Sequence, residues 1–151
     1  IDVFGNLNST VIGDHSNPKV RLPGSGGAND VGSSCWRTII IMQHDKRRFI
    51  PKIDFVTTPG YLSGASARED AGLPPNTGPY RVVTSLCTLG FDQETKWMKL
   101  LALNPGVTVD DVIENTGFEL IIPDHIGHNP EPSEEELDIL RHDVDKDRYY
   151  I

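Results

Sequence analysis

The segment that most constrains the fold is a glycine-rich run from Pro23 to Asp30, which reads Pro-Gly-Ser-Gly-Gly-Ala-Asn-Asp. Three glycines within four positions permit left-handed backbone and remove the Cβ atoms that would hold a ligand away. A short β-prone stretch, residues 19–22, precedes the run, and Asn29 or Asp30 could cap a short helix reaching Trp36. The pattern predicts a strand, a tight loop and a helix, with the glycines near the helix N-terminus.

Such a loop is a candidate site for negative charge, because consecutive exposed N–H groups can surround an anionic oxygen. The residues assigned to it are Gly24, Ser25, Gly26, Gly27, Ala28, Asn29 and Asp30. The run lacks the Lys-Ser/Thr ending of a phosphate-binding P-loop and the GxGxxG spacing of a dinucleotide fold. An ordinary surface turn, with Asn29 and Asp30 as simple caps, is the alternative interpretation.

Charge and hydrophobicity narrow the class of protein. The 151 residues are 37% hydrophobic, enough for one domain with a buried core. A formal net charge of −8 argues against general binding to nucleic acid or to an anionic membrane. The longest apolar run, residues 38–42, is too short to span a bilayer and predicts a buried strand.

The beginning of the chain and its cysteines bear on processing and compartment. The first residues, Ile1 to Phe4, lack an initiator Met and have the pattern of a strand interior, so we expect a piece of a longer polypeptide. Cys35 and Cys87 lie far apart without CxxC or Cys/His spacing. This arrangement predicts two reduced thiols and a cytoplasmic protein.

Extended structure is predicted for much of the first half. Residues 1–11 predict a hairpin that turns at Gly5-Asn6. Residues 38–43 and 49–57 predict two further extended segments, and residues 60–79 a long ordered loop with one helical turn at 67–71.

The second half combines strands with two punctuated helices. Strands are predicted at residues 80–86, 89–92, 96–103 and 118–122. The first helix has Thr108 as N-cap, Asp111 at the third position, Val112 and Ile113 facing inward, and Gly117 as C-cap. The second begins with a capping box of Ser133 and Glu136 and carries Leu137 and Leu140 on its apolar face. Strands mixed with helices predict an α/β domain.

Several segments together resemble one known family. Gly24 to Asp30 resembles the glycine loop in the β subunits of family I coenzyme A transferases, such as glutaconate CoA-transferase and the succinyl-CoA:3-ketoacid CoA-transferases. Further resemblances follow in order at residues 2–10, 52–62, 79–84, 105–112 and 116–118, with Ile53 where valine would be commoner. This ordered series covers in effect the whole chain.

The resemblance implies a fold and a reaction. The fold would be α/β, a mixed sheet with flanking helices of the NagB/RpiA/CoA-transferase-like type, with residues 1–151 as the C-terminal portion of one β-subunit domain. The reaction would move coenzyme A between an acyl-CoA thioester and a carboxylic acid through a glutamyl-CoA intermediate. The glycine loop would stabilise the oxyanion of each tetrahedral intermediate.

The catalytic glutamate is expected outside this sequence. The family carries it in a Glu-Asn-Gly or Glu-Ser-Gly motif upstream of the glycine loop, and no glutamate precedes Gly24 here. No catalytic residue is therefore assigned in this chain, and alone it should be inactive. Expected partners are a CoA-transferase α subunit, the N-terminal part of its own β subunit, acyl-CoA and a carboxylic acid, with no metal and no cofactor besides coenzyme A as substrate.

Other readings of the same residues stay open. The scaffold also serves CoA-thioester hydrolases and carbon–carbon lyases that lack the glutamate, and a non-catalytic CoA-binding fragment is a third possibility. Arg21, Arg68 and Arg81 could hold a second carboxylate, although structural pairing is the commoner role of an arginine. His125 and His128 have a metal-compatible spacing but lie in a proline-flanked stretch that predicts a loop.

Overall fold

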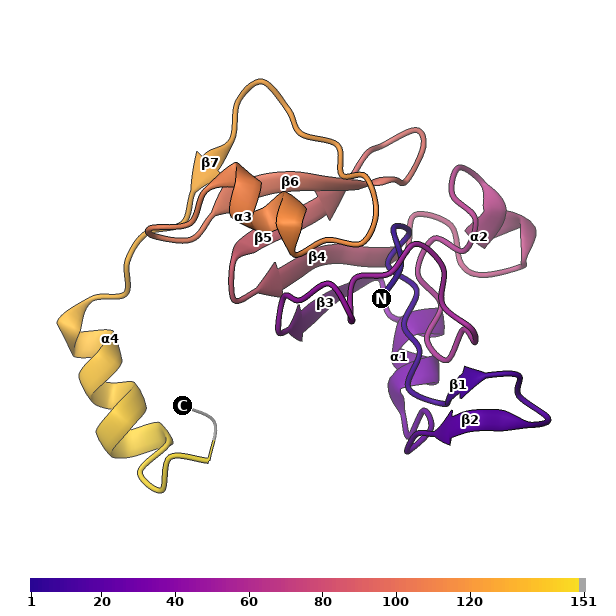
Figure 1. Cartoon of the computed structure of the whole chain (residues 1–151), viewed down its shortest axis with the longest axis horizontal. Helices are drawn as coiled ribbons and strands as arrows, with labels where there is room; N and C mark the ends of the chain where they lie inside the picture. The colour runs from indigo at the N-terminus through magenta and orange to yellow at the C-terminus, as the bar shows by residue number, and fades with distance from the viewer. Residues whose placement is uncertain (150–151) are drawn as a thin grey trace.

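A five-stranded mixed sheet organises the chain in the computed structural model, which describes residues 1–149 (Figure 1). The strands in order across the sheet are β3 (Arg37–Met42), β4 (Gly78–Thr84), β5 (Cys87–Phe91), β6 (Met98–Leu103) and β7 (Gly127–His128). β3 is parallel to β4, β4 to β6 form an antiparallel meander, and β7 is parallel to β6. The predicted mixed sheet is confirmed.

The core lies against one face of this sheet. Cross-strand partners Val82 and Leu89, and then Leu100, are completely buried on adjacent strands. Val112 of helix α3 (Val109–Glu114) is also completely buried in this cluster, and so is Phe49 of the loop that follows β3, residues 43–50. A side chain of this size gains roughly 1.5–3 kcal/mol on full burial, so these contacts hold α3 and the residue 43–50 loop to the sheet.

A smaller unit precedes the main sheet. Strands β1 (Val11–Gly13) and β2 (Pro18–Arg21) form an antiparallel hairpin, and helix α1 (Ala28–Ser34) follows β2 after the glycine loop. Helix α2 (Ala67–Asp70) is the helical turn predicted within the long loop of residues 60–79. α1 also contacts β4, so the glycine loop is tied to the main sheet through this helix.

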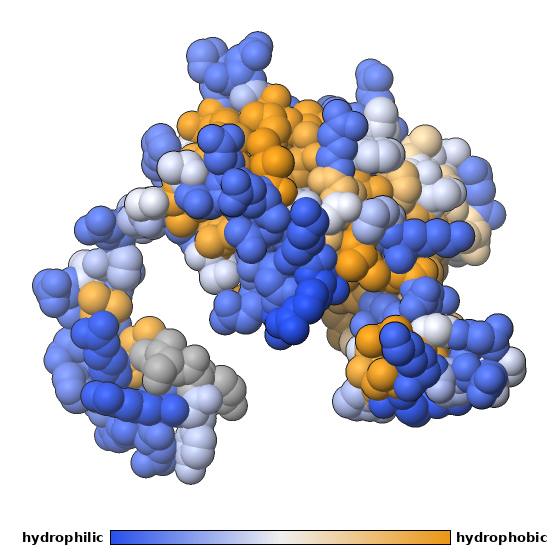
Figure 2. Space-filling view, in the orientation of Figure 1, coloured by the Kyte–Doolittle hydropathy of each residue, from blue (hydrophilic) through white to orange (hydrophobic). Residues whose placement is uncertain are grey.

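A helical arm follows β7 and projects from the sheet (Figure 1). It consists of α4 (Glu134–Ile139) and a π-helical turn (Leu140–Val144), and its capping box of Ser133 and Glu136 is present as predicted. Figure 2 shows the arm as mainly hydrophilic with small apolar patches. Among residues 1–149, no helix is long and apolar enough to cross a membrane.

The predicted hairpin at residues 1–11 is wrong. The first strand begins only at Val11, and the actual hairpin joins β1 and β2 across residues 14–17. Residues 1–7 instead form a loop whose turn is closed by the Asp2 carboxylate, which accepts hydrogen bonds from the backbone N–H groups of Phe4 and Asn6. Side-chain hydrogen bonds to the backbone compete with strand pairing at such positions.

Three other local predictions need correction. Residues 49–57 form no strand, because their backbone partners are single loop residues such as Ile1 and Leu7. Residues 118–122 contribute only one bridge, between Ile121 and Lys99. Helix α3 ends at Glu114 with Asn115 as C-cap rather than Gly117, and Ile113 is 49% exposed rather than inward.

Candidate functional site

The glycine loop leaves β2 and turns directly into α1, as the sequence predicts. Gly24 and Gly26 have φ values of +95° and +50°, a region in which side chains with a Cβ are strained. The two glycines therefore let the chain reverse between Pro23 and Ala28. Gly27 has an ordinary φ of −86° and is the N-cap of α1.

The loop is fixed at its base and open at its tip. The backbone N–H of Gly24 donates to the Ser9 carbonyl at 2.7 Å, and the Ser9 hydroxyl donates to the Gly24 carbonyl at 2.8 Å. Within the part of the chain that the structure describes, the backbone N–H groups of Ser25, Gly26 and Gly27 have no protein acceptor. A Cβ added at Gly24, Gly26 or Gly27 would meet no atom within 4 Å. The tip thus offers unpaired donors beside open space.

Asn29 and Asp30 behave differently from the capping roles considered for them. Neither caps α1, because the N-cap is Gly27 and no side chain caps this helix end. The Asn29 side chain instead donates to the carbonyl of Thr57 at 2.8 Å, which ties the helix to the residue 57–60 segment. Asp30 is exposed in the first turn, where a carboxylate is favoured by the helix dipole.

A buried arginine secures the other end of α1. Arg68 is 2% exposed, and its guanidinium donates to the carbonyls of Gly32 at 2.7 Å, Gly60 at 2.9 Å and Pro59 at 3.2 Å. Its Nε also donates to the Thr77 hydroxyl at 3.0 Å. Arg68 therefore satisfies helix-end carbonyls and joins α1 to two loops, and the structural interpretation of this arginine holds over carboxylate binding.

A second buried network joins the first loop to residues 60–62. Asn6 is 2% exposed; its amide donates to the Asp2 carboxylate and to the Leu62 carbonyl, each at 2.8 Å. Its side-chain oxygen accepts from the backbone N–H groups of Gly60 at 2.8 Å and Leu62 at 3.0 Å. Burial raises the pKa of Asp2, although its hydrogen bonds from Asn6 act in the opposite direction. Residue 6 was expected in a turn, and nothing in the sequence pattern indicated this network.

His44 and Cys87 form a buried pair. A histidine beside a cysteine is the pairing of a base with a catalytic nucleophile, but the pKa shifts of this pair disfavour the charged forms that such a site needs. The two lie 3.6 Å apart, and both ring nitrogens of His44 contact threonine hydroxyls, Thr84 and Thr116, at 3.0 Å. Burial lowers the pKa of His44 to about 4 and raises that of Cys87 to about 11. Both groups are therefore neutral near pH 7, whereas a reactive cysteine needs a stabilised thiolate. The pair is structural.

This histidine makes folding stability depend on pH. The unfolded chain binds a proton near the ordinary pKa of 6.5, whereas the folded chain binds it only near 4. Between these values the unfolded state holds more protons, so the free energy of unfolding falls as pH falls, by about 3 kcal/mol across this window. Urea unfolding of the chain and of His44→Gln at pH 7 and pH 4.5 measures the effect. The substitution should lower the free energy of unfolding at pH 7 and reduce its change between pH 7 and pH 4.5. An equal change in the free energy of unfolding between these pH values in both proteins would contradict this role of His44.

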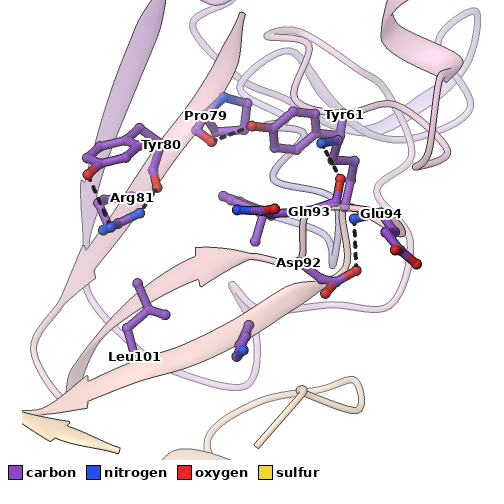
Figure 3. Close-up of a pocket in the computed structure, with 11 residues that line it drawn as sticks. Tyr61, Pro79, Tyr80, Arg81, Asp92, Gln93, Glu94 and Leu101 are labelled. Atoms are coloured by element: carbon purple, nitrogen blue, oxygen red, sulfur yellow. Dashed lines mark hydrogen bonds between the residues drawn. The ribbon is translucent and has the colours of Figure 1, made fainter. Parts of the chain in front are cut away.

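An open cleft of about 650 Å³ lies over β4 to β6 (Figure 3). Arg81 stacks on the Tyr80 ring at 3.8 Å and donates to the Tyr80 carbonyl, while the Tyr61 hydroxyl donates to the Pro79 carbonyl. Lysines and carboxylates share the remaining wall, so the cleft has no single charge preference. None of the residues assigned to the glycine loop lines it.

The remaining candidates are dispersed. Arg21 donates to the His15 carbonyl and is exposed. His125 and His128 are exposed, and within residues 1–149 no group of three or more His, Cys, Asp or Glu side chains could hold a metal ion. Cys35 and Cys87 are unpaired, Cys35 being exposed and Cys87 buried.

Comparison with known proteins identifies close relatives. The family model described as coenzyme A transferase matches residues 1–115. The β subunit of glutaconate CoA-transferase from Acidaminococcus fermentans is 45% identical over the whole chain, and the crystal structure of that enzyme superimposes with a TM-score of 0.92. The β subunit of 3-oxoadipate CoA-transferase from Pseudomonas knackmussii is 40% identical over 93% of the chain. The IpdB subunit of the cholesterol ring-cleaving hydrolase of Rhodococcus jostii is 31% identical over 96%.

These relatives are considerably longer than the chain. The matches cover 56%, 54% and 56% of the three relatives, so the chain spans about half the length of each. The glycine loop lies inside the matched family region. The mixed-sheet α/β fold is shared with the glutaconate enzyme.

Proposed function

Because this chain belongs to the coenzyme A transferase family, we propose that it forms part of a subunit that moves coenzyme A from an acyl-CoA thioester to a carboxylic acid. A glutamate carboxylate attacks the thioester carbonyl, and the coenzyme A thiolate leaves with formation of a mixed anhydride. The thiolate then attacks the glutamyl carbonyl, which releases the first acid and leaves a glutamyl-CoA thioester. The acceptor acid reverses these steps, so one hard exchange is divided into easier ones.

The glycine loop supports this proposal most directly. Each addition places negative charge on a carbonyl oxygen, and the unpaired N–H groups of Ser25, Gly26 and Gly27 can donate to it. The absence of Cβ atoms at Gly26 and Gly27 leaves the backbone accessible to a substrate. The rest of the assigned loop, Gly24 and residues 28–30, fixes its base and begins α1.

The nucleophile is proposed to lie in sequence beyond this chain. All eight glutamates are exposed: Glu69, Glu94, Glu114, Glu119, Glu131, Glu134, Glu135 and Glu136. Glu136 serves as the reciprocal partner in the Ser133 capping box, and the others show no enclosed environment that would prepare a carboxylate for attack. This chain alone is therefore expected to be inactive.

The proposed setting is a heteromeric enzyme. We infer that residues 1–151 form the C-terminal portion of a single β-subunit domain, paired with an α subunit and completed by the N-terminal part of its own subunit. The lengths of the relatives support this division. Two unpaired cysteines fit the cytoplasm, and coenzyme A enters as a substrate rather than as a resident cofactor.

Chemical trapping tests the reaction class. The complete enzyme is incubated with acyl-CoA, reduced with borohydride and digested, and its glutamates are examined by mass spectrometry. Reduction converts a glutamyl thioester to an alcohol, so one modified glutamate should appear only after acyl-CoA is added. Active enzyme without any modified glutamate would reject the transferase proposal.

A hydrolase is the second candidate, because the resemblance to the IpdB hydrolase subunit also spans nearly the whole chain. The identities of 45% and 40% to two transferase subunits favour transfer over this alternative. Product analysis separates them. A transferase requires an acceptor acid and forms a second acyl-CoA, whereas a hydrolase consumes acyl-CoA with water alone.

Gly27→Val should reduce turnover by about 100-fold in the complete enzyme, because the new side chain fills the open space beside the loop donors. The position has an ordinary φ, and an added Cβ meets no atom within 4 Å. Valine is a poorer N-cap residue than glycine, so the free energy of unfolding should fall by no more than about 1 kcal/mol. Steady-state kinetics and urea unfolding measure the two quantities.

Gly32→Val is the matched control. A Cβ at Gly32 would lie 2.3 Å from the Cγ2 of Thr58, so this variant should lose stability and activity together. If Gly27→Val retains full turnover, the proposed function of the loop is wrong.

A further inference from the structure

The first unpaired donor of the glycine loop, the Ser25 N–H, is oriented from the other end of its own peptide unit. A peptide unit joins the C=O of one residue to the N–H of the next, and in a planar trans unit the two bonds point in roughly opposite directions. The Gly24–Ser25 peptide is trans, and its Gly24 carbonyl accepts a hydrogen bond from the Ser9 hydroxyl at 2.8 Å. Because Ser9 lies at the base of the loop, the Ser25 N–H points away from this base.

The next two peptide units are held in the same manner. The Ser25 carbonyl accepts from the N–H of Ala28 at 2.9 Å, which fixes the unit that carries the Gly26 N–H. The Gly26 carbonyl accepts from the Ser25 hydroxyl at 3.1 Å, which fixes the unit that carries the Gly27 N–H. Each unpaired donor of the loop is therefore oriented through the carbonyl of its own peptide unit.

Ser9 is itself anchored to the interior. Its backbone N–H donates to the hydroxyl of Thr57 at 2.9 Å, and its carbonyl accepts from the Gly24 N–H at 2.7 Å. Thr57 is 3% exposed, and its hydroxyl also contacts the Thr10 hydroxyl at 2.8 Å. The Thr57 carbonyl accepts from the side chain of Asn29 at 2.8 Å. One buried residue thus ties together the base of the loop and the first turn of α1.

The Gly24–Ser25 peptide needs a contact of this kind because packing does not hold it. Gly24 lacks a Cβ and has a φ of +95°, and glycine populates both signs of φ about equally. Among the described residues, no atom lies within 4 Å of the position that a Cβ would take on Gly24. The N–H of Gly24 belongs to the preceding peptide unit. The Ser9 hydroxyl is therefore the group that acts on the unit carrying the Ser25 N–H.

We propose that Ser9 is a positioning residue for the transfer reaction. Its hydroxyl sets the direction of the Ser25 N–H before negative charge develops on the substrate, which is the condition under which an oxyanion donor is effective. A hydrogen bond to the carbonyl end also polarises the peptide unit and strengthens its N–H as a donor. Ser9 acts through the Gly24–Ser25 peptide rather than on a reacting atom.

This role rests on the proposed function of the glycine loop and adds to it a residue outside the assigned stretch of residues 24–30. Ser9 lies fifteen positions before Gly24 in sequence and reaches the loop only through the fold. It follows that the loop glycines alone do not make the site: a hydroxyl at position 9 is also required.

Kinetics of the complete enzyme test the positioning role. Ser9→Ala removes one atom from a half-buried side chain, so the fold should persist. Its kcat should fall by at least about tenfold while KM for acyl-CoA stays within about twofold, because the misdirected donor acts in the transition state. Ser9→Thr keeps the hydroxyl and should bring kcat back to within about threefold of the unchanged enzyme.

Ser66→Ala is the matched control. The Ser66 hydroxyl also donates one hydrogen bond of 2.8 Å, to the Asp70 carboxylate of α2, and is exposed. Its removal should leave kcat within about twofold, since no loop donor depends on it. An equal loss of kcat in Ser9→Ala and Ser66→Ala, or a normal kcat in Ser9→Ala, would overturn the positioning role.

A crystal structure of the complete enzyme with Ser9→Ala gives a readout that does not depend on catalysis. The Gly24 carbonyl should leave its original direction, and the Ser25 N–H should turn with it. An unrotated peptide would overturn the proposal, whatever the value of kcat. A rotated peptide with a normal kcat would instead show that Ser9 orients the Ser25 N–H but that this donor does not stabilise the oxyanion, so the proposed function of the loop would fail.

Discussion

Replacement of Asn6 by leucine is expected to lower the free energy of unfolding by about 4 kcal/mol, a large fraction of the stability of a small domain. The Asn6 side chain is buried and bonds to the carboxylate of Asp2, the backbone N–H groups of Gly60 and Leu62, and the Leu62 carbonyl. Leucine has a similar size but neither donates nor accepts. The Gly60 N–H group and both backbone groups of Leu62 would lose these bonds in a largely buried setting, which costs more than the loss of the bonds themselves. The Asp2 carboxylate would keep the backbone N–H groups of residues 4 and 6 but lose the amide of Asn6.

Urea unfolding monitored by circular dichroism measures the change, with Asn115→Leu as the control. Asn115 is half-buried, and its side chain donates one bond, to the Asp111 carbonyl, so its replacement should cost about 1 kcal/mol or less. Comparable losses in the two variants would show that the buried network contributes no more than a single exposed bond.

The N-terminal ends of two helices could be predicted because their signals are local. The capping boxes at Thr108 with Asp111 and at Ser133 with Glu136 form between residues three positions apart, and both are present. A local signal gave the wrong prediction at the C-terminal end of α3. Gly117 looked like a C-cap, but its lack of a Cβ serves a distant contact: an added Cβ would lie 2.3 Å from the carbonyl oxygen of Phe49.

The strands of the meander were predictable for a related reason. β4, β5 and β6 are joined by short connections, so each strand pairs with a neighbour close in sequence. The segments whose apolar patterns predict strands therefore do form strands. Residues 49–57 and 118–122 have β-prone sequences as well. Their outcome depends on the partners available, and only the single bridge between Lys99 and Ile121 forms for the second segment.

The first loop shows where sequence patterns are insufficient. Gly5-Asn6 between β-prone residues predicts a hairpin, and Gly5 does have a positive φ of 73°. The residues on the two sides of Gly5-Asn6 do not pair as strands, because the Asn6 side chain bonds to residues more than fifty positions away. An alternation of polar and apolar residues is a local pattern, so it cannot predict a contact between residues that lie more than fifty positions apart.

The candidate site likewise has one part that the sequence predicted and another that it did not. The glycine loop was evident from composition, and its unpaired N–H groups follow from glycine conformations that the sequence permits. The contacts that hold the loop in place were not evident, although the sequence had marked Asn29 and Arg68 as candidates. Ser9, Asn29 and Arg68 each act through main-chain carbonyls, which every sequence possesses and no motif specifies.

Arg68→Met should destabilise the chain by about 4 kcal/mol and reduce turnover of the complete enzyme further than the loss of folded protein explains. The guanidinium is buried and donates to the carbonyls of Gly32, Pro59 and Gly60, and methionine can satisfy none of them. Gly32 belongs to α1, so this helix, whose N-cap is Gly27, should shift relative to the residue 57–60 segment. A small shift of positioned donors has a large effect on rate, because oxyanion stabilisation depends on geometry.

Two further variants separate positioning from general stability. Arg81→Met removes an arginine that stacks on Tyr80 near the surface, and it should cost about 1 kcal/mol or less and leave turnover unchanged. Arg68→Lys keeps the charge but cannot reach several carbonyls in one plane, so it should recover only part of the stability. Assays at a temperature where each variant is fully folded would then show a lower kcat for Arg68→Met with little change in KM for acyl-CoA. A normal kcat in that folded protein would mean that Arg68 stabilises the chain without positioning the glycine loop.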